Sequence, residues 1–169
     1  AEATNMVNKV IGYMDNKDTG SWKNNVCFVA DDGSSADGYM INHADQADRL
    51  GEYINTSHPE FLVNKIYFDA YKKDVSGGLA TYPDVKTNIQ KQLKNGLLLI
   101  NYTGHGSTTA WSDERVLTES DITQSTYTRL PIWITATCDF CRFDASVTSA
   151  GEQVFLNKVS GGIGLFTTT

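Results

Sequence analysis

Two short segments combine the residue types that nucleophilic catalysis needs. An apolar run at 97–102 leads into the sequence TGHGS, which contains His105, and an apolar run at 131–136 leads into TCD, which contains Cys138. A free thiol has a pKa of about 8.5, so it needs a nearby imidazole that favours the thiolate or passes a proton to a leaving amine. We therefore predict that Cys138 and His105 form a Cys/His dyad.

Glycines on both sides of His105 suit a sharp turn that approaches a substrate closely. The backbone amides of Gly106 and Cys138 are candidates for an oxyanion hole. This assignment requires the two apolar runs to be neighbouring strands, about 4.8 Å apart, whose ends meet at one edge of a sheet. In open α/β sheets, ligands bind at that edge, beyond the carboxyl ends of the strands.

The wider sequence predicts such a sheet. Short runs rich in aliphatic and aromatic residues alternate with helical patterns, which is typical of βαβ units and a mostly parallel sheet. The runs at 97–100 and 132–134 are almost continuously apolar, as in strands covered by helices on both faces. The predicted strands are 26–30, 65–70, 97–102, 131–136 and 162–166.

Three helices are expected between the strands. A stripe of Ala44, Ala47, Leu50 and Ile54 indicates one, and a second is expected from Pro83 to the Asn95-Gly96 stop. The last is predicted over about 146–159, with Val147, Ala150, Val154 and Phe155 facing inward. The stretch 31–38 is rich in Gly, Ser and Asp, and it is long enough to be a functional loop.

Composition excludes several classes of protein. The 14 basic and 20 acidic side chains give a net charge of −6, which argues against nucleic-acid binding because that needs clustered Lys and Arg. No apolar run approaches the roughly 20 residues of a membrane span. Three cysteines rule out a disulfide scaffold. The 169 residues fit one domain, and we expect a piece of a larger protein, because the chain lacks an initiator Met and stops after a strand-like run.

The two motifs resemble the gingipain family of cysteine peptidases, which are relatives of the caspases. The similarity lies in NYTGHGSTTAWSDE at 101–114 and LPIWITATCDFCRFD at 130–144, each at the end of a central strand. It implies one caspase-like catalytic subdomain over 1–169, a three-layer α/β sandwich with a mostly parallel central sheet. Cys138 is then the nucleophile, His105 the catalytic histidine, and the Gly106 and Cys138 amides the oxyanion hole. Thr137 stands where the family often has Ala.

Within the family, the segments are most similar to the PorU-type sortases of the type IX secretion system. That resemblance implies cleavage of the carboxyl-terminal signal domain of secreted cargo, with the acyl group passed to an amine of surface lipopolysaccharide. It also implies other outer-membrane components of the secretion system as partners, and a place outside the cytoplasm, at the outer membrane or cell surface of a Gram-negative bacterium. Cleavage by hydrolysis and by transpeptidation use the same residues up to the acyl-enzyme.

The resemblance also implies an orienting carboxylate after the first strand. Asp32 is the nearest match, and Asp31 lies beside it. Together with Asp37 these residues offer oxygen ligands for Ca²⁺, but no regular loop spacing supports such a site, and a solvated acidic loop is the preferred interpretation. No cofactor is expected.

Other reactive residues carry weaker predictions. Cys141 forms Cys-x-x-Cys with Cys138 and is interpreted as a spare thiol, because no second Cys/His pair completes a zinc site. A thiol-disulfide oxidoreductase remains an alternative, which would need the pair at a helix N-terminus. A non-catalytic scaffold is the other alternative.

The two remaining histidines are given no role. His43 is interpreted as a helix-start residue and His58 as an exposed residue before a proline. Trp111, Ser112 and Asp113 either line a substrate pocket or anchor their loop.

Overall fold

Five parallel strands form the central sheet of the computed structural model, which describes residues 2–33 and 42–169. The strand order is β2-β1-β3-β6-β7, with every neighbouring pair parallel. This confirms the α/β class. The strands are β1 (Asn25–Ala30), β2 (Leu62–Tyr67), β3 (Leu99–Thr103), β6 (Ile132–Ala136) and β7 (Gly164–Thr167).

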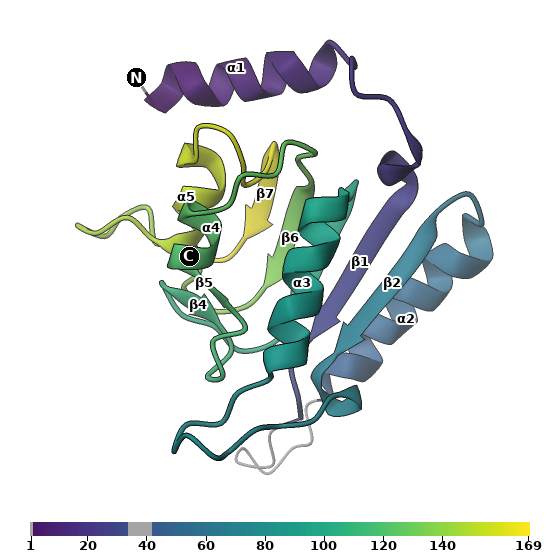
Figure 1. Cartoon of the computed structure of the whole chain (residues 1–169), viewed down its shortest axis with the longest axis vertical. Helices are drawn as coiled ribbons and strands as arrows, with labels where there is room; N and C mark the ends of the chain where they lie inside the picture. The colour runs from purple at the N-terminus through teal and green to yellow at the C-terminus, as the bar shows by residue number, and fades with distance from the viewer. Residues whose placement is uncertain (1, 34–41) are drawn as a thin grey trace.

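The helices lie around this sheet as Figure 1 shows, with α3 crossing its front and α1 at one end. A separate antiparallel pair, β4 (Ala110–Trp111) and β5 (Leu117–Thr118), follows β3. The helices are α1 (Glu2–Met14), α2 (His43–Ser57), α3 (Pro83–Asn95), α4 (Glu119–Thr123) and α5 (Ala150–Leu156), and short 3₁₀ turns occupy Ser21–Asn24 and Phe68–Ala70.

Each face of the sheet has its own core. On one face, Cys27, Ile100 and Trp133 stand in register on β1, β3 and β6 and are fully buried. They belong to a large apolar cluster that includes α3 and α5. On the other face, Ala47 of α2 packs with Phe28 in a smaller cluster. Helices on both sides of one sheet make the three layers that the sequence predicts.

Helix α3 forms as predicted. Pro83 lies in its first turn, where a missing N–H costs nothing, and Val85, Ile89 and Leu93 are its buried residues. Gly96 follows with φ 99°, a left-handed conformation that glycine adopts without strain. Burying each of those aliphatic side chains contributes about 1.5–3 kcal/mol to stability.

The predicted inward stripe of α2 is wrong at Leu50, which is 52 % exposed. Gly51 faces the sheet instead, and a Cβ there would lie within 3.6 Å of Lys65, Val63 and Phe28. The small residue lets the helix lie close to β1 and β2. With Gly51 facing the sheet, Leu50 points outward.

The predicted last helix is too long. Helix α5 begins at Ala150, because Ser149 and Glu152 form a capping box that starts it there, and it ends at Leu156. Val147 therefore precedes the helix and is exposed, although Ala150 and Val154 are buried as expected. The second strand also starts earlier than predicted, at Leu62, and the chain turns into a 3₁₀ helix after Tyr67.

Helix α1 is not among the predicted elements. It is held to the rest of the fold by buried Lys9, whose ammonium donates hydrogen bonds to the carbonyls of Val154 (3.2 Å) and Ser160 (3.0 Å). Burial lowers the pKa of Lys9 to about 8. Among the described helices, none combines the length and the apolar character that crossing a membrane requires.

Candidate active site

The register of β3 and β6 places His105 and Cys138 at matching positions. Thr103 pairs with Ala136. His105 lies two residues after Thr103, and Cys138 lies two residues after Ala136. The Gly104 amide donates to the Ala136 carbonyl (3.2 Å), so the two segments remain paired one residue beyond the strands. Both predicted catalytic side chains are exposed at the carboxyl edge of the sheet.

The turn after His105 leaves the Gly106 amide free of the backbone ladder. Gly106 and Trp111 form an isolated antiparallel bridge. The bonds that flank it run from the Ser112 amide to the His105 carbonyl (2.8 Å) and from the Ser107 amide to the Ala110 carbonyl (3.0 Å). In this pattern the Gly106 N–H makes no backbone hydrogen bond within residues 2–33 and 42–169. Among the described residues, the Cys138 amide also has no backbone partner.

Thr137 fills the space beside Gly106. A Cβ on residue 106 would collide with Oγ1 of Thr137 and lie 3.2 Å from its Cγ2. The Thr137 side chain is buried, and its hydroxyl has no hydrogen-bond partner in the described part of the chain. Thr137 thus packs against a position that only glycine fits.

Asp31 holds the backbone of His105. Its Oδ2 accepts a hydrogen bond from the His105 amide (2.9 Å) and lies 3.3 Å from the Tyr102 hydroxyl. That hydroxyl donates to the His105 carbonyl (2.6 Å), so both peptide groups of His105 are fixed. Burial raises the pKa of Asp31 to about 7, and the Asp32 carboxylate adds to the increase.

Asp32, the predicted orienting acid, is bound elsewhere. Its Oδ2 accepts from Lys73 (2.8 Å) and from the Tyr82 hydroxyl (3.0 Å), and Lys73 also pairs with Glu114 (2.8 Å). Burial by itself would raise the pKa of Asp32, but the hydrogen bonds from Lys73 and Tyr82 outweigh it and the pKa lies below its usual value. Of the two adjacent acids, Asp31 is the one that contacts His105.

Asp31, Asp32 and Glu114 bring one carboxylate oxygen each within 4.8 Å of one another. The Lys73 ammonium binds two of these three acids and so compensates their charge from within the chain. Asp37, which completed the acidic cluster considered for Ca²⁺, lies outside the described residues.

His43 is a neighbour of the site that the sequence did not identify. Its ring lies 5.4 Å from that of His105, centroid to centroid, at 90°. His43 is only 9 % exposed, and neither ring nitrogen has a hydrogen-bond partner among the described residues. The available signal was topological, because the helix after β1 must begin at the same sheet edge where β3 ends.

Trp111 and Ser112 belong to the interior. Trp111 is fully buried and stacks on Tyr102, with ring centroids 4.4 Å apart and planes 7° from parallel. Ser112 is also buried and has a positive φ of 56°, whereas Asp113 is exposed. Of the two interpretations, these contacts favour anchoring of the loop after His105.

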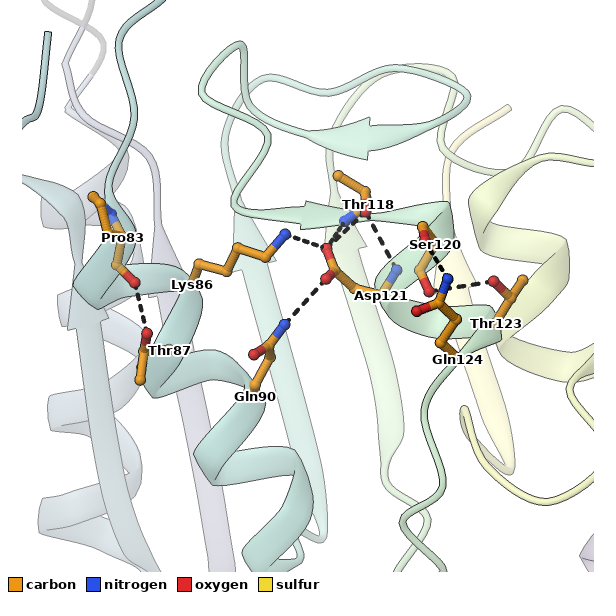
Figure 2. A network of polar contacts seen from close by, with 9 residues as sticks. All are labelled: Pro83, Lys86, Thr87, Gln90, Thr118, Ser120, Asp121, Thr123 and Gln124. Carbon is orange, nitrogen blue, oxygen red and sulfur yellow. Dashed lines mark hydrogen bonds and ion pairs between the residues drawn. The ribbon is translucent and has the colours of Figure 1, made fainter. Parts of the chain in front are cut away.

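A polar network fastens the rest of this loop to α3. Figure 2 shows Asp121 of α4 receiving hydrogen bonds from Lys86 (2.8 Å) and Gln90 (3.0 Å) of α3. Asp121 also accepts from the amide and hydroxyl of Thr118 in a capping box. The segment that returns from His105 is thereby tied to a helix of the main core.

The two cysteines of the Cys-x-x-Cys sequence lie in a turn. Asp139 between them has a φ of 53°, and α5 begins only at Ala150. Burial, followed by the charge of Glu152, raises the pKa of Cys141, which is the opposite of the activation that a redox pair needs. The helix N-terminus required by the oxidoreductase alternative is not at these residues.

His58 is exposed, as the sequence predicts, and lies 3.5 Å from Glu60.

Comparison with known proteins identifies the family. A family model described as peptidase family C25 matches residues 1–169, the whole of the sequence. The chain belongs to peptidase family C25. A search of curated proteins finds no match.

Three solved structures are similar to the chain in fold. The Arg-specific cysteine proteinase gingipain R (RgpB) superimposes with a TM-score of 0.74 at 20 % identity, covering 96 % of this chain and 36 % of that one. The pro- and mature-domain complex of Porphyromonas gingivalis RgpB gives 0.69 at 21 % identity, with coverages of 95 % and 36 %. A structure described as a protease gives 0.70 at 23 % identity, with coverages of 98 % and 33 %. The C25 chain thus has the caspase-like fold that its motifs imply, and it spans about a third of these structures.

Proposed function

We propose that this chain carries the nucleophile and the histidine of a cysteine peptidase. The observation that carries the proposal is the register of β3 and β6, which brings His105 and Cys138 two residues beyond a paired position on adjacent strands. Both side chains are exposed there, while the backbone of His105 is fixed by hydrogen bonds to Tyr102 and Asp31. Membership of peptidase family C25 supports the same chemistry.

The proposed reaction begins with attack of the Cys138 thiolate on a peptide carbonyl carbon. The Gly106 and Cys138 amides stabilise the resulting oxyanion, since neither is used by the backbone ladder. His105 then gives its proton to the departing amine as the C–N bond breaks, leaving a thioester on Cys138. Water or a second amine attacks the thioester and restores the thiol.

We further propose, from the similarity of 101–114 and 130–144 to PorU-type sortases, that the whole protein processes secreted cargo. In this proposal the substrate is a carboxyl-terminal signal domain, and a lipopolysaccharide amine takes the acyl group. Other outer-membrane secretion components are its partners, and its location is the surface of a Gram-negative cell. Incubation of the full-length protein, cargo peptide and a glycine-amide acceptor tests this, because an amide-linked product indicates transfer and a free acid indicates hydrolysis.

Cys138 and Cys141 provide a matched pair for testing the peptidase proposal. In the full-length protein, Cys138→Ala should abolish both peptide cleavage and labelling by a thiol-directed peptide probe, because it removes the nucleophile. Cys141→Ala should keep most of both, since that thiol is half-buried three residues away. Equal loss of activity in the two variants would support the redox alternative, and cleavage by both would leave Cys138 without the proposed role.

A further inference from the structure

His105 has no carboxylate partner at its ring in the described part of the chain. Asp31 accepts from its backbone amide, and Asp32 is occupied by Lys73 and Tyr82. In a nucleophile-base pair the base is normally oriented by a third group, which fixes its tautomer and stabilises its cation. The carboxylates of Asp31 and Asp32 therefore accept hydrogen bonds from groups other than the His105 ring.

The ring of His43 is the side chain placed to fill that role. The two ring planes are perpendicular with their centroids 5.4 Å apart, and His43 comes from a different element, the first turn of α2. Its nitrogens are buried without a hydrogen-bond partner in the described residues, although buried polar groups are nearly always satisfied. In the proposed reaction His105 must take up a proton. An unsatisfied ring nitrogen of His43 is suited to accept a hydrogen bond from the protonated His105 ring.

We propose that His43 is a positioning residue for His105, accepting a hydrogen bond from its ring when His105 is protonated and holding the ring toward Cys138. The proposal rests on the peptidase function proposed above. His43 acts through His105 and makes no contact with substrate.

The surroundings keep His43 in the neutral form that an acceptor requires. The charged groups that face it are His105 after β3 and Asp32 after β1. Burial lowers the pKa of His43, a positive charge on His105 lowers it further, and Asp32 opposes both to a smaller degree. His43 is therefore harder to protonate when His105 is cationic.

Three variants of the full-length protein separate ring packing from hydrogen bonding. His43→Phe keeps an aromatic ring against His105 but removes the nitrogens, His43→Gln keeps a hydrogen-bond acceptor, and His58→Phe changes an exposed histidine as the control. We expect His43→Phe to lower kcat by about tenfold or more with KM nearly unchanged, because a hydrogen bond to a charged group corresponds to roughly that factor. His43→Gln should recover part of the loss, and His58→Phe should match the wild type.

The rate of Cys138 alkylation by iodoacetamide against pH provides a measurement that needs no peptide substrate. Loss of the acceptor makes His105 a weaker base, so the midpoint for alkylation in His43→Phe should move upward toward that of an ordinary thiol. An unchanged kcat and an unchanged midpoint in folded His43→Phe would overturn the proposal. A shifted midpoint in a protein that cleaves no peptide would instead support His43 and defeat the peptidase function.

If His43→Phe does not fold, ¹⁵N-histidine NMR of the wild-type protein decides the question. We expect the His43 ring to stay neutral at the ordinary histidine pKa of about 6.5 and to gain a proton only at lower pH. A His43 ring that is half protonated at or above about pH 6.5 would overturn the proposal, because a charged ring cannot accept a hydrogen bond from His105.

Discussion

The carboxyl edge of the sheet has two halves that are built differently. At the ends of β3 and β6, the chain presents His105 and Cys138 to solvent on a backbone whose amides are partly unpaired. At the end of β1, acids and their partners are joined in one network, with Asp31 bound to the His105 backbone and Asp32 bound to Lys73 and Tyr82. The same edge thus combines exposed reactive groups with enclosed polar ones.

This difference indicates a division of tasks. In the proposed function, the side chains of His105 and Cys138 must reach a substrate, so they are exposed and depend on the backbone for their position. The acids are enclosed, and burying a charged group is costly unless hydrogen bonds compensate for it, so their task is to hold the frame. Substitutions in the first half should change the rate more than the stability, and substitutions in the second half should do the reverse.

After Cys138→Ala, the largest expected effect on the rate comes from His105→Ala in the full-length protein. Loss of the proton carrier should lower kcat by roughly 10²–10⁴-fold, the usual range for general acid-base catalysis. Because the side chain is exposed, the melting temperature should change little. Steady-state kinetics and thermal unfolding of the same preparation measure both. A large fall in melting temperature, with normal activity per folded molecule, would place His105 in the structural half instead.

Gly106→Ala should affect both the rate and the stability, because residue 106 directly follows His105 and packs against Thr137, which directly precedes Cys138. Its Cβ would collide with buried Thr137, and such overpacking costs about 1–3 kcal/mol. Replacing Thr137 by Ala removes the colliding atoms, so the double variant should recover most of the stability lost by Gly106→Ala. Chemical denaturation of the two single variants and the double variant measures this coupling. Strictly additive losses would show that Thr137 is not what restricts residue 106.

The sequence predicted the positions of His105 and Cys138 better than the contacts of the acids and of His43. Apolar runs and glycine punctuation are local signals, and they were sufficient to locate β3, β6 and the residues that follow them. They do not specify partners that are distant in the chain. The contacts of Asp32 with Lys73 and Tyr82, and of His43 with His105, depend on the packing of separate elements.

Two predictions about helices were also wrong in detail. The apolar pattern over 146–159 has a helical period, but a capping box at Ser149 starts α5 later than the pattern suggests. In α2, an apolar stripe predicted that Leu50 faces inward, whereas close packing at Gly51 decides the helix orientation. Periodicity indicates that a helix exists, and specific caps and contacts decide where it begins and which residues it buries.

Asp31→Asn should produce a pH-dependent difference in stability. Burial raises the pKa of Asp31 to about 7, well above the usual value for an unfolded chain, which is about 3.9. Between these values the unfolded chain loses its proton while the folded chain keeps it, so wild-type stability falls as pH rises from about 4 to 7. Asparagine keeps an oxygen for the His105 amide and does not titrate. The melting temperature of Asp31→Asn relative to wild type should therefore rise between pH 4.5 and pH 8, whereas Asp113→Asn, at an exposed position, should follow the wild type. A difference that stays constant across this range would mean that Asp31 is already charged in the folded protein, and the enclosed half of the edge would then hold a buried carboxylate rather than a neutral acid.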